Sequence, residues 1–299
     1  MNEAGEMLFD PAAPLTATGN LRRRQLVSRL AESVSTGAAL LALAVLGIVI
    51  YAVVSRGASV LGWDFLTKAP PLAGPGGGIA PQIVGTALIV TLATGIAMPL
   101  GILVALYLTE FAGPRAGRSI KLTLDVLNGM PSIVIGLFVF GLLVVGHHQS
   151  GFAAAVALAI IMLPLIARAA QEVLLLVPST LREAADALGV SRWRSVTGVI
   201  LPTAMGGILT GTVLAVARAA GETAPLILVC SIFSNTTSVN VFGQALPNIP
   251  VYIFTSSEQA DPSGFARAWG AAFVLMGFIL VTSLGARALL ARSRSKISR

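Results

Sequence analysis

Six long apolar stretches constrain this chain more than any other feature of its sequence. Each is about 20 or more residues long with very few charged side chains, the length that an α-helix needs to cross a bilayer. The chain is 55% hydrophobic and 11% charged, whereas soluble domains carry about 25% charged residues. We therefore predict an all-α integral membrane protein whose six-helix domain (31–292) lies between a basic N-terminal segment (1–30) and a basic tail (293–299). The predicted spans are residues 34–54, 82–107, 122–146, 151–170, 203–233 and 269–290.

The Lys and Arg residues indicate which side of the membrane each connection faces. Most of the 20 Lys and Arg residues lie in or at the edge of the N-terminal segment, the second and fourth connections and the C-terminal tail. Six spans place both termini on one side, and the side rich in Lys and Arg is the cytoplasm. We therefore expect both termini and the fourth connection to be cytoplasmic. The same bias accounts for the net charge of +7, so we expect membrane lipid and not nucleic acid around these residues.

The fourth connection, residues 178–202, is patterned as structure and not as a simple link. Its charged side chains cannot enter the bilayer core, where each costs about 2.5–3.5 kcal/mol. Thr180 and Glu183 have the spacing of a capping box, and Gly189 is suited to the left-handed residue that ends a helix. We therefore predict a short helix over 181–188. The residues alone leave open whether this helix docks on a partner or only connects two spans.

The same connection resembles the EAA signature of ABC-importer permeases, which reads EAA, three residues, G, nine residues, then I-x-L-P. The matching residues are Glu183, Ala184, Ala185, Gly189, Leu201 and Pro202, with Val199 in place of the isoleucine. The resemblance implies a type I ABC importer permease in which these residues couple the chain to a cytoplasmic ATPase. It also implies that the chain is not an enzyme, because a separate subunit hydrolyses ATP.

Two charged residues, Arg218 and Glu222, lie inside the fifth apolar stretch. They are four residues apart and would share one face of a continuous helix. An Arg guanidinium suits phosphate or carboxylate oxygens, and charges within a membrane mark substrate paths. We predict a path that includes Arg218, Glu222 and Thr223, with Glu222 holding Arg218 when the site is empty. Gly221 and Pro225 predict a hinge or a break there, and a purely structural ion pair remains the alternative.

The third apolar stretch carries a second possible part of that path. Asn128 and Ser132 are four residues apart and would place polar groups on one helix face, while Pro131 would loosen the helix between them and serve as a hinge. The alternative is a packing face of small residues, which is common between membrane helices. The residues alone do not decide between these two.

Three further stretches resemble the PstA-type permease subunits of bacterial phosphate ABC importers. They are RAAGETAPLI (218–227), NGMPSIVIGLF (128–138) and IPVYIFTSSEQADPSGFARAW (249–269). The resemblance implies uptake of inorganic phosphate across the bacterial inner membrane. It also implies a homologous second permease (PstC-type), two copies of an ATPase (PstB-type) and a periplasmic phosphate-binding protein (PstS-type).

Other functions remain possible at this point. The chain could be a permease for another oxyanion, such as molybdate or sulfate. A proton-coupled secondary carrier would use Glu222 as its proton relay, but it leaves the EAA pattern unexplained, and a membrane scaffold or sensor would transport nothing. The sequence contains no GxxxxGK[ST] phosphate-binding loop and no Cys or His spacing typical of a metal site. We therefore expect no cofactor, no metal and an external source of energy.

Overall fold

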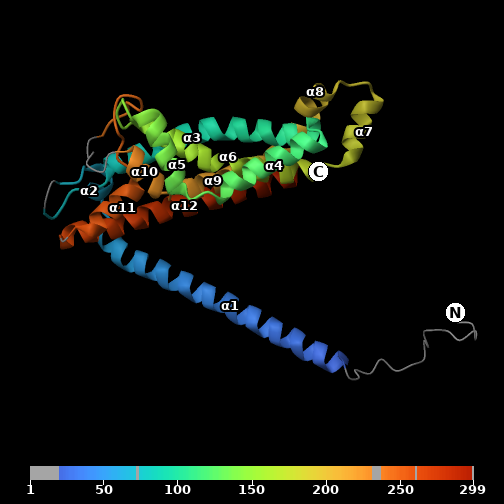
Figure 1. The fold of residues 1–299 in the computed structure, drawn as a ribbon. Coiled ribbons are helices and arrows are strands. Elements are labelled where there is room, and N and C mark those ends of the chain that lie inside the picture. The colour runs from blue at the N-terminus through green and yellow to red at the C-terminus, as the bar shows by residue number, and fades with distance from the viewer. Residues whose placement is uncertain (1–19, 72–73, 231–236, 260, 298–299) are drawn as a thin grey trace, which may run out of the picture. The chain divides into compact units, whose positions relative to one another are not determined.

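Helices make up all the regular structure in the part of the chain that the computed structural model describes, residues 20–71, 74–230, 237–259 and 261–297 (Figure 1). Five helical segments there are long and apolar enough to cross a membrane, and a strongly bent helix pair raises the number to six. The prediction of an all-α membrane protein is therefore confirmed, with six candidate spans if the bent pair counts as one. The long helices are α1 (Asn20–Gly57), α3 (Ala80–Leu106), α6 (Gly151–Leu175), α9 (Leu201–Ala219) and α12 (Pro262–Ile297).

The chain divides into two units, Met1–Ala52 and Val53–Arg299. The described part of the first unit belongs to α1, which begins at Asn20 and so extends the predicted first span through its basic flank. Beyond that flank, α1 carries Leu, Val, Ile and Ala on all sides, which is typical of a helix that is surrounded by lipid. All further elements belong to the second unit.

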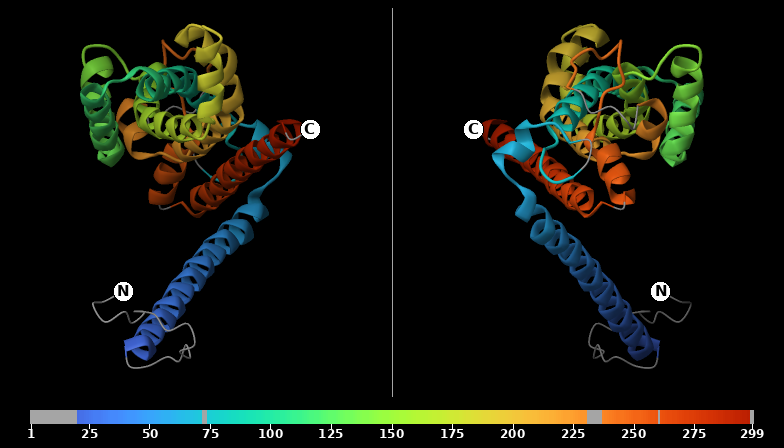
Figure 2. Two further views of the ribbon diagram at one scale, coloured as in Figure 1. Left: turned by 90° about the vertical axis from the view of Figure 1, so that its right-hand side faces the viewer. Right: turned by 90° about the vertical axis from the view of Figure 1, so that its left-hand side faces the viewer.

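Helix α6 forms the centre of the second unit. Its fully buried residues include Ala153, Ala154, Ala157 and Ala167, and it packs against α3 and α9, with α12 lying along α9 (Figure 2). Small side chains allow helix backbones to approach closely, which is how membrane helices commonly associate. The alanine-rich sequence of α6 is therefore consistent with its central, closely packed position.

The predicted third span is wrong as a single helix. The structure has two helices, α4 (Pro114–Gly129) and α5 (Ser132–Val139), which meet at an angle of 99°. Met130 is extended there (φ −70°, ψ 137°), because a residue before proline avoids the helical conformation. Pro131 thus causes a complete break and not the loosening that its sequence position suggested. As a consequence, Asn128 and Ser132 lie on different helices and do not share one face.

The fifth span is also interrupted, at the place that Gly221 and Pro225 predicted. Helix α9 ends at Ala219 and α10 (Ala224–Val229) begins five residues later. The predicted end of this span, at residue 233, lies outside the described residues. Helix α10 packs against α5, and a Cβ placed on Gly136 would come within 2.6 Å of the Pro225 Cα. The two broken spans therefore meet close to their breaks.

The remaining helices lie in the connections. The structure contains a 3₁₀-helical turn (Ala58–Val60), α2 (Trp63–Thr67), α7 (Ser179–Ala187), α8 (Arg192–Ser195) and α11 (Ile249–Glu258). It also contains three π-helical turns, Tyr107–Phe111, Phe140–Val144 and Val196–Ile200. Helices α7 and α8 project from one end of the second unit, whereas α2, α10 and α11 lie toward its other end (Figure 1).

Candidate transport site and coupling segment

The coupling segment, which we define as residues 178–202, contains the short helix that the sequence predicted. Helix α7 begins at Ser179, two residues earlier than predicted, because Pro178 occupies its N-cap position. No side chain caps it, so the predicted capping box of Thr180 and Glu183 is wrong. Gly189 is left-handed as predicted (φ +67°), and the Val190 amide donates to the Ala185 carbonyl at 3.0 Å. The glycine therefore ends α7 and turns the chain toward α8.

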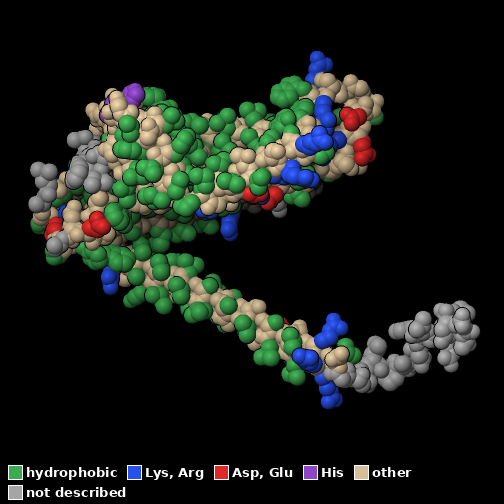
Figure 3. Space-filling view, viewed as in Figure 1, with side chains coloured by type: hydrophobic (Ala, Val, Ile, Leu, Met, Phe, Trp, Pro, Cys, Tyr) green, Lys and Arg blue, Asp and Glu red, His purple; other side chains and the backbone are tan. Residues whose placement is uncertain are grey.

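One side of α7 faces outward. Ala185 is buried against its own chain, whereas Glu183 and Ala184 are exposed and the Leu188 side chain is 82% exposed. Charged residues surround this end of the second unit, while hydrophobic side chains cover its middle (Figure 3). A helix this short is unstable alone in water. This end of the coupling segment therefore presents an exposed apolar residue, Leu188, beside charged ones.

The coupling segment continues without interruption into the fifth span. Helix α8 leads through the π-helical turn Val196–Ile200 into α9, where Leu201 is the first residue and Pro202 follows it. Proline is tolerated at a helix start, and it lies in the first turn of α9 here. Helices α8 and α9 are thus joined by continuous helical backbone.

Arg218 lies in the last turn of α9 and is exposed. The predicted pairing of Arg218 with Glu222 is wrong, since within the described residues no hydrogen bond or ion pair joins the two side chains. The reason is local: the Glu222 amide donates to the Ala219 carbonyl (3.1 Å) in a tight turn, so Glu222 leaves the helix face that carries Arg218. The Arg218 guanidinium makes no hydrogen bond or ion pair within the described part of the chain. An ionisable side chain in a membrane span marks a candidate substrate or ion path.

The other predicted path residues lie at the two helix breaks. Glu222 and Thr223 are half-buried between α9 and α10, and Thr223 is at the N-cap position of α10. Asn128 is exposed near the end of α4, and Ser132 is half-buried at the start of α5. The packing of α5 on α10 brings these two groups of elements together.

Sequence reasoning missed several charged contacts. Asp125 of α4 pairs with Arg168 of α6, and Glu110 pairs with Arg182 of α7 at 2.9 Å. Arg267 of α12 is buried and donates to the Gly74 carbonyl at 2.8 Å. These pairs cannot be predicted from sequence spacing, because each contact joins residues far apart in the chain. The sequence shows only that each of these charged residues lies beside or within an apolar stretch.

Comparison with known proteins identifies the family. Residues 97–295 match the model of the family described as "Binding-protein-dependent transport system inner membrane component". The phosphate transport system permease protein PstA of Xylella fastidiosa (strain Temecula1 / ATCC 700964) is 38% identical over 93% of this chain and 98% of its own length. PstA 1 of Mycobacterium tuberculosis (strain ATCC 25618 / H37Rv) is 41% identical over 70% of this chain and 68% of its own length.

Solved structures show the same fold. A chain of a bacterial alginate ABC transporter aligns with a TM-score of 0.61, at 16% identity, over 88% of this chain and 98% of its own. A chain of the MetNI methionine ABC transporter aligns with a TM-score of 0.55, at 18% identity, over 72% and 94%. The chain is thus a multi-pass inner-membrane component that works with an ATPase and a binding protein and is not itself catalytic. It belongs to the binding-protein-dependent ABC importer permeases, in the family of the phosphate transport system permease proteins PstA.

Proposed function

We propose that this permease conducts inorganic phosphate across the inner membrane and that Arg218 contacts the ion in transit. The observation that carries the proposal is the Arg218 side chain, which is exposed in a membrane span and has no partner in the described residues. A guanidinium offers a permanent charge and a planar fork of donors to an oxyanion that has lost its water. The names of the 38–41% identical relatives supply phosphate as the oxyanion.

The residues at the two helix breaks complete the proposed path. Glu222, Thr223, Asn128 and Ser132 are at least partly exposed there, and interrupted membrane helices present backbone polar groups to a pathway. Because Glu222 is not paired with Arg218, its carboxylate is available as an acceptor for a protonated phosphate. Pro131, Gly221 and Pro225 are the proposed hinges, since both breaks occur at these residues.

The coupling segment is the proposed ATPase contact. Glu183, Ala184 and Leu188 on the exposed side of α7 would enter the ATPase, while Ala185 and Gly189 hold the shape of the helix and Leu201 and Pro202 begin α9. The assembly would contain a homologous second permease, two ATPase copies and a periplasmic phosphate-binding protein. Both termini and the coupling segment would be cytoplasmic.

Replacing Arg218 tests the phosphate contact. R218Q removes the charge and should abolish phosphate uptake into proteoliposomes that contain the complete transporter, while R218K should retain part of it. Co-purification of the ATPase with each variant controls for assembly. Competition by unlabelled sulfate and molybdate separates phosphate from other oxyanions. Uptake by R218Q at the wild-type rate would remove Arg218 from the path.

A further inference from the structure

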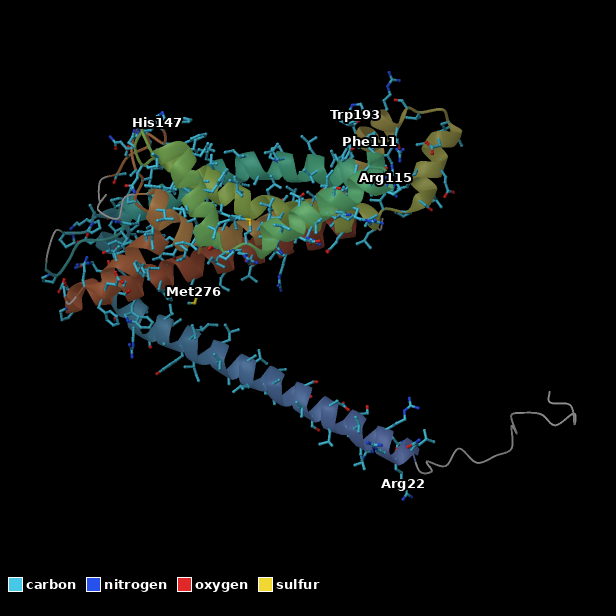
Figure 4. All side chains as sticks on the ribbon, in the orientation of Figure 1. Arg22, Phe111, Arg115, His147, Trp193 and Met276 are labelled. Atoms are coloured by element: carbon cyan, nitrogen blue, oxygen red, sulfur yellow. The ribbon has the colours of Figure 1, made fainter. Side chains whose placement is uncertain are left out.

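The end of α3 contacts both helices of the coupling segment. The π-helical turn Tyr107–Phe111 extends α3 and ends in two adjacent residues, Glu110 and Phe111. Glu110 Oε1 accepts hydrogen bonds from Arg182 of α7, from Nε at 3.2 Å and Nη2 at 2.9 Å. The Phe111 ring lies 6.5 Å from the Trp193 ring of α8 (centroid to centroid; Figure 4).

Glu110 is a charged residue in a buried position. It is only 4% exposed, and a buried carboxylate that loses its partner is strongly unfavourable. The ion pair therefore favours one position of α7 relative to the end of α3. The Arg192 guanidinium, 5.6 Å above the Phe111 ring, adds a cation–π contact to the same end.

Arg182 also joins a third element. Its guanidinium donates to the carbonyls of Leu174 (3.1 Å) and Val177 (2.8 Å) at the end of α6. Carbonyls at a helix end have no partner within the helix, so the bond to Leu174 also caps α6. One side chain thus connects α7, the end of α3 and the end of α6. The planar Arg fork fixes the direction of α7 in a way that a single flexible donor does not.

We propose that Glu110 and Phe111 form a second transmission point, through which movement of α7 and α8 displaces α3 as well as α9. The inference rests on the proposed docking of α7 on the ATPase. Helix α9 follows the coupling segment through continuous backbone, whereas Glu110 is 72 residues from Arg182 in the sequence and is linked to it only in space. Helices α3 and α9 both pack on α6. The contact between Glu110 and Arg182 therefore lets one docking event move both of these helices relative to the central helix. Glu110, Phe111 and Arg182 are positioning residues, which do not touch phosphate.

The decisive measurement is phosphate uptake per ATP hydrolysed by the reconstituted complete transporter. E110Q keeps the shape of the side chain but removes its charge, and F111A removes the aromatic contact. Each should assemble and hydrolyse ATP, and each should lower the ratio at least about fivefold, the scale of coupling between sites. E172Q is the matched control, because Glu172 is an exposed carboxylate of α6 for which no contact is found in the described part of the chain.

Two outcomes would overturn the inference. One is an unchanged ratio in both E110Q and F111A, and the other is loss of assembly in E110Q, which would make Glu110 a folding residue. Failure of the proposed function looks different. A cysteine at the exposed Leu188 (L188C in a C230S background) should cross-link to the ATPase, and the unaltered transporter should take up phosphate. Absence of either signal rejects the proposed function, whatever E110Q does.

Discussion

Arg218 and Glu222 show how the role of a residue depends on the helix that carries it. A charge inside an apolar stretch is visible in the sequence, which is why Arg218 could be selected as a site residue. The prediction that it pairs with Glu222 failed, because the four-residue spacing assumes a continuous helix, whereas α9 ends at Ala219. Glu110 and Arg182 were missed for the opposite reason. They lie 72 residues apart in the sequence, and only the fold brings them together.

Asp261 allows a prediction of pH dependence at the end opposite the coupling segment. The hydroxyl and amide of Ser263, together with the nearby Arg267, lower the pKa of its carboxyl below the usual value of an aspartate. A lowered pKa in the folded state stabilises the fold above the unfolded pKa, and this contribution disappears as the pH falls through the folded pKa. We expect the purified protein to lose thermal stability as the pH is lowered below about 4. D261N should lose less thermal stability than the unaltered protein over the same pH range. Thermal unfolding at a series of pH values measures this difference.

A matched pair of variants separates Asp261 from other acidic groups. S263A removes one hydrogen bond to Asp261 and should reduce the pH-dependent loss of stability. E258Q removes another exposed carboxyl group, in α11, and should leave that loss unchanged. Identical pH profiles for D261N and the unaltered protein would contradict the assignment.

At the scale of elements, hydropathy predicts where spans occur but not whether they are straight. The stretch 122–146 is apolar and long enough to cross a membrane, yet Pro131 divides it. The angle between its halves depends on contacts made elsewhere, namely the ion pair of Asp125 with Arg168 and the packing of α5 on α10. Such contacts join distant parts of the chain. The break at Gly221 and Pro225 was predictable because its cause is local.

Gly136 should be intolerant of larger side chains. A Cβ there would come within 2.6 Å of the Pro225 Cα, so G136V must push α5 away from α10. Overpacking of this kind costs about 1–3 kcal/mol, and here it separates the two broken spans. We expect G136V to lower both thermal stability and phosphate uptake. G141V is the control, because no atom lies within 4 Å of a Cβ at Gly141, and equal effects of the two variants would refute the explanation.

Gly189 should be needed for the shape of the coupling segment. Its φ of +67° costs a residue with a side chain about 1–2 kcal/mol, although there is space for a Cβ. We expect G189A to reduce co-purification of the ATPase while the transmembrane helices still fold. Gly198 lies in the same segment, also has space for a Cβ and does not have a positive φ. G198A should therefore behave like the unaltered protein, and a greater loss in G198A than in G189A would contradict the role of backbone conformation.

For the molecule as a whole, the distribution of basic residues and the fold agree on which connections share an end of the second unit. Arg115 at the start of α4 lies near Trp193 of α8, and His147 lies at the other end (Figure 4). The second and fourth connections, both rich in Lys and Arg, thus meet at one end. At the other end, Arg267 fastens the loop that contains Gly74 and Gly76 to α12.

This arrangement predicts opposite accessibility for the two ends. In a C230S background, L188C should react with a membrane-impermeant maleimide only from the cytoplasmic side, and H147C only from the periplasmic side. Leu188 is 82% exposed and His147 is exposed, so neither reaction is prevented by burial in the chain. The positive-inside rule supports the orientation, and the fold independently requires that the two residues differ. Labelling of both from one side would contradict the fold, whereas labelling with the sides exchanged would contradict only the orientation.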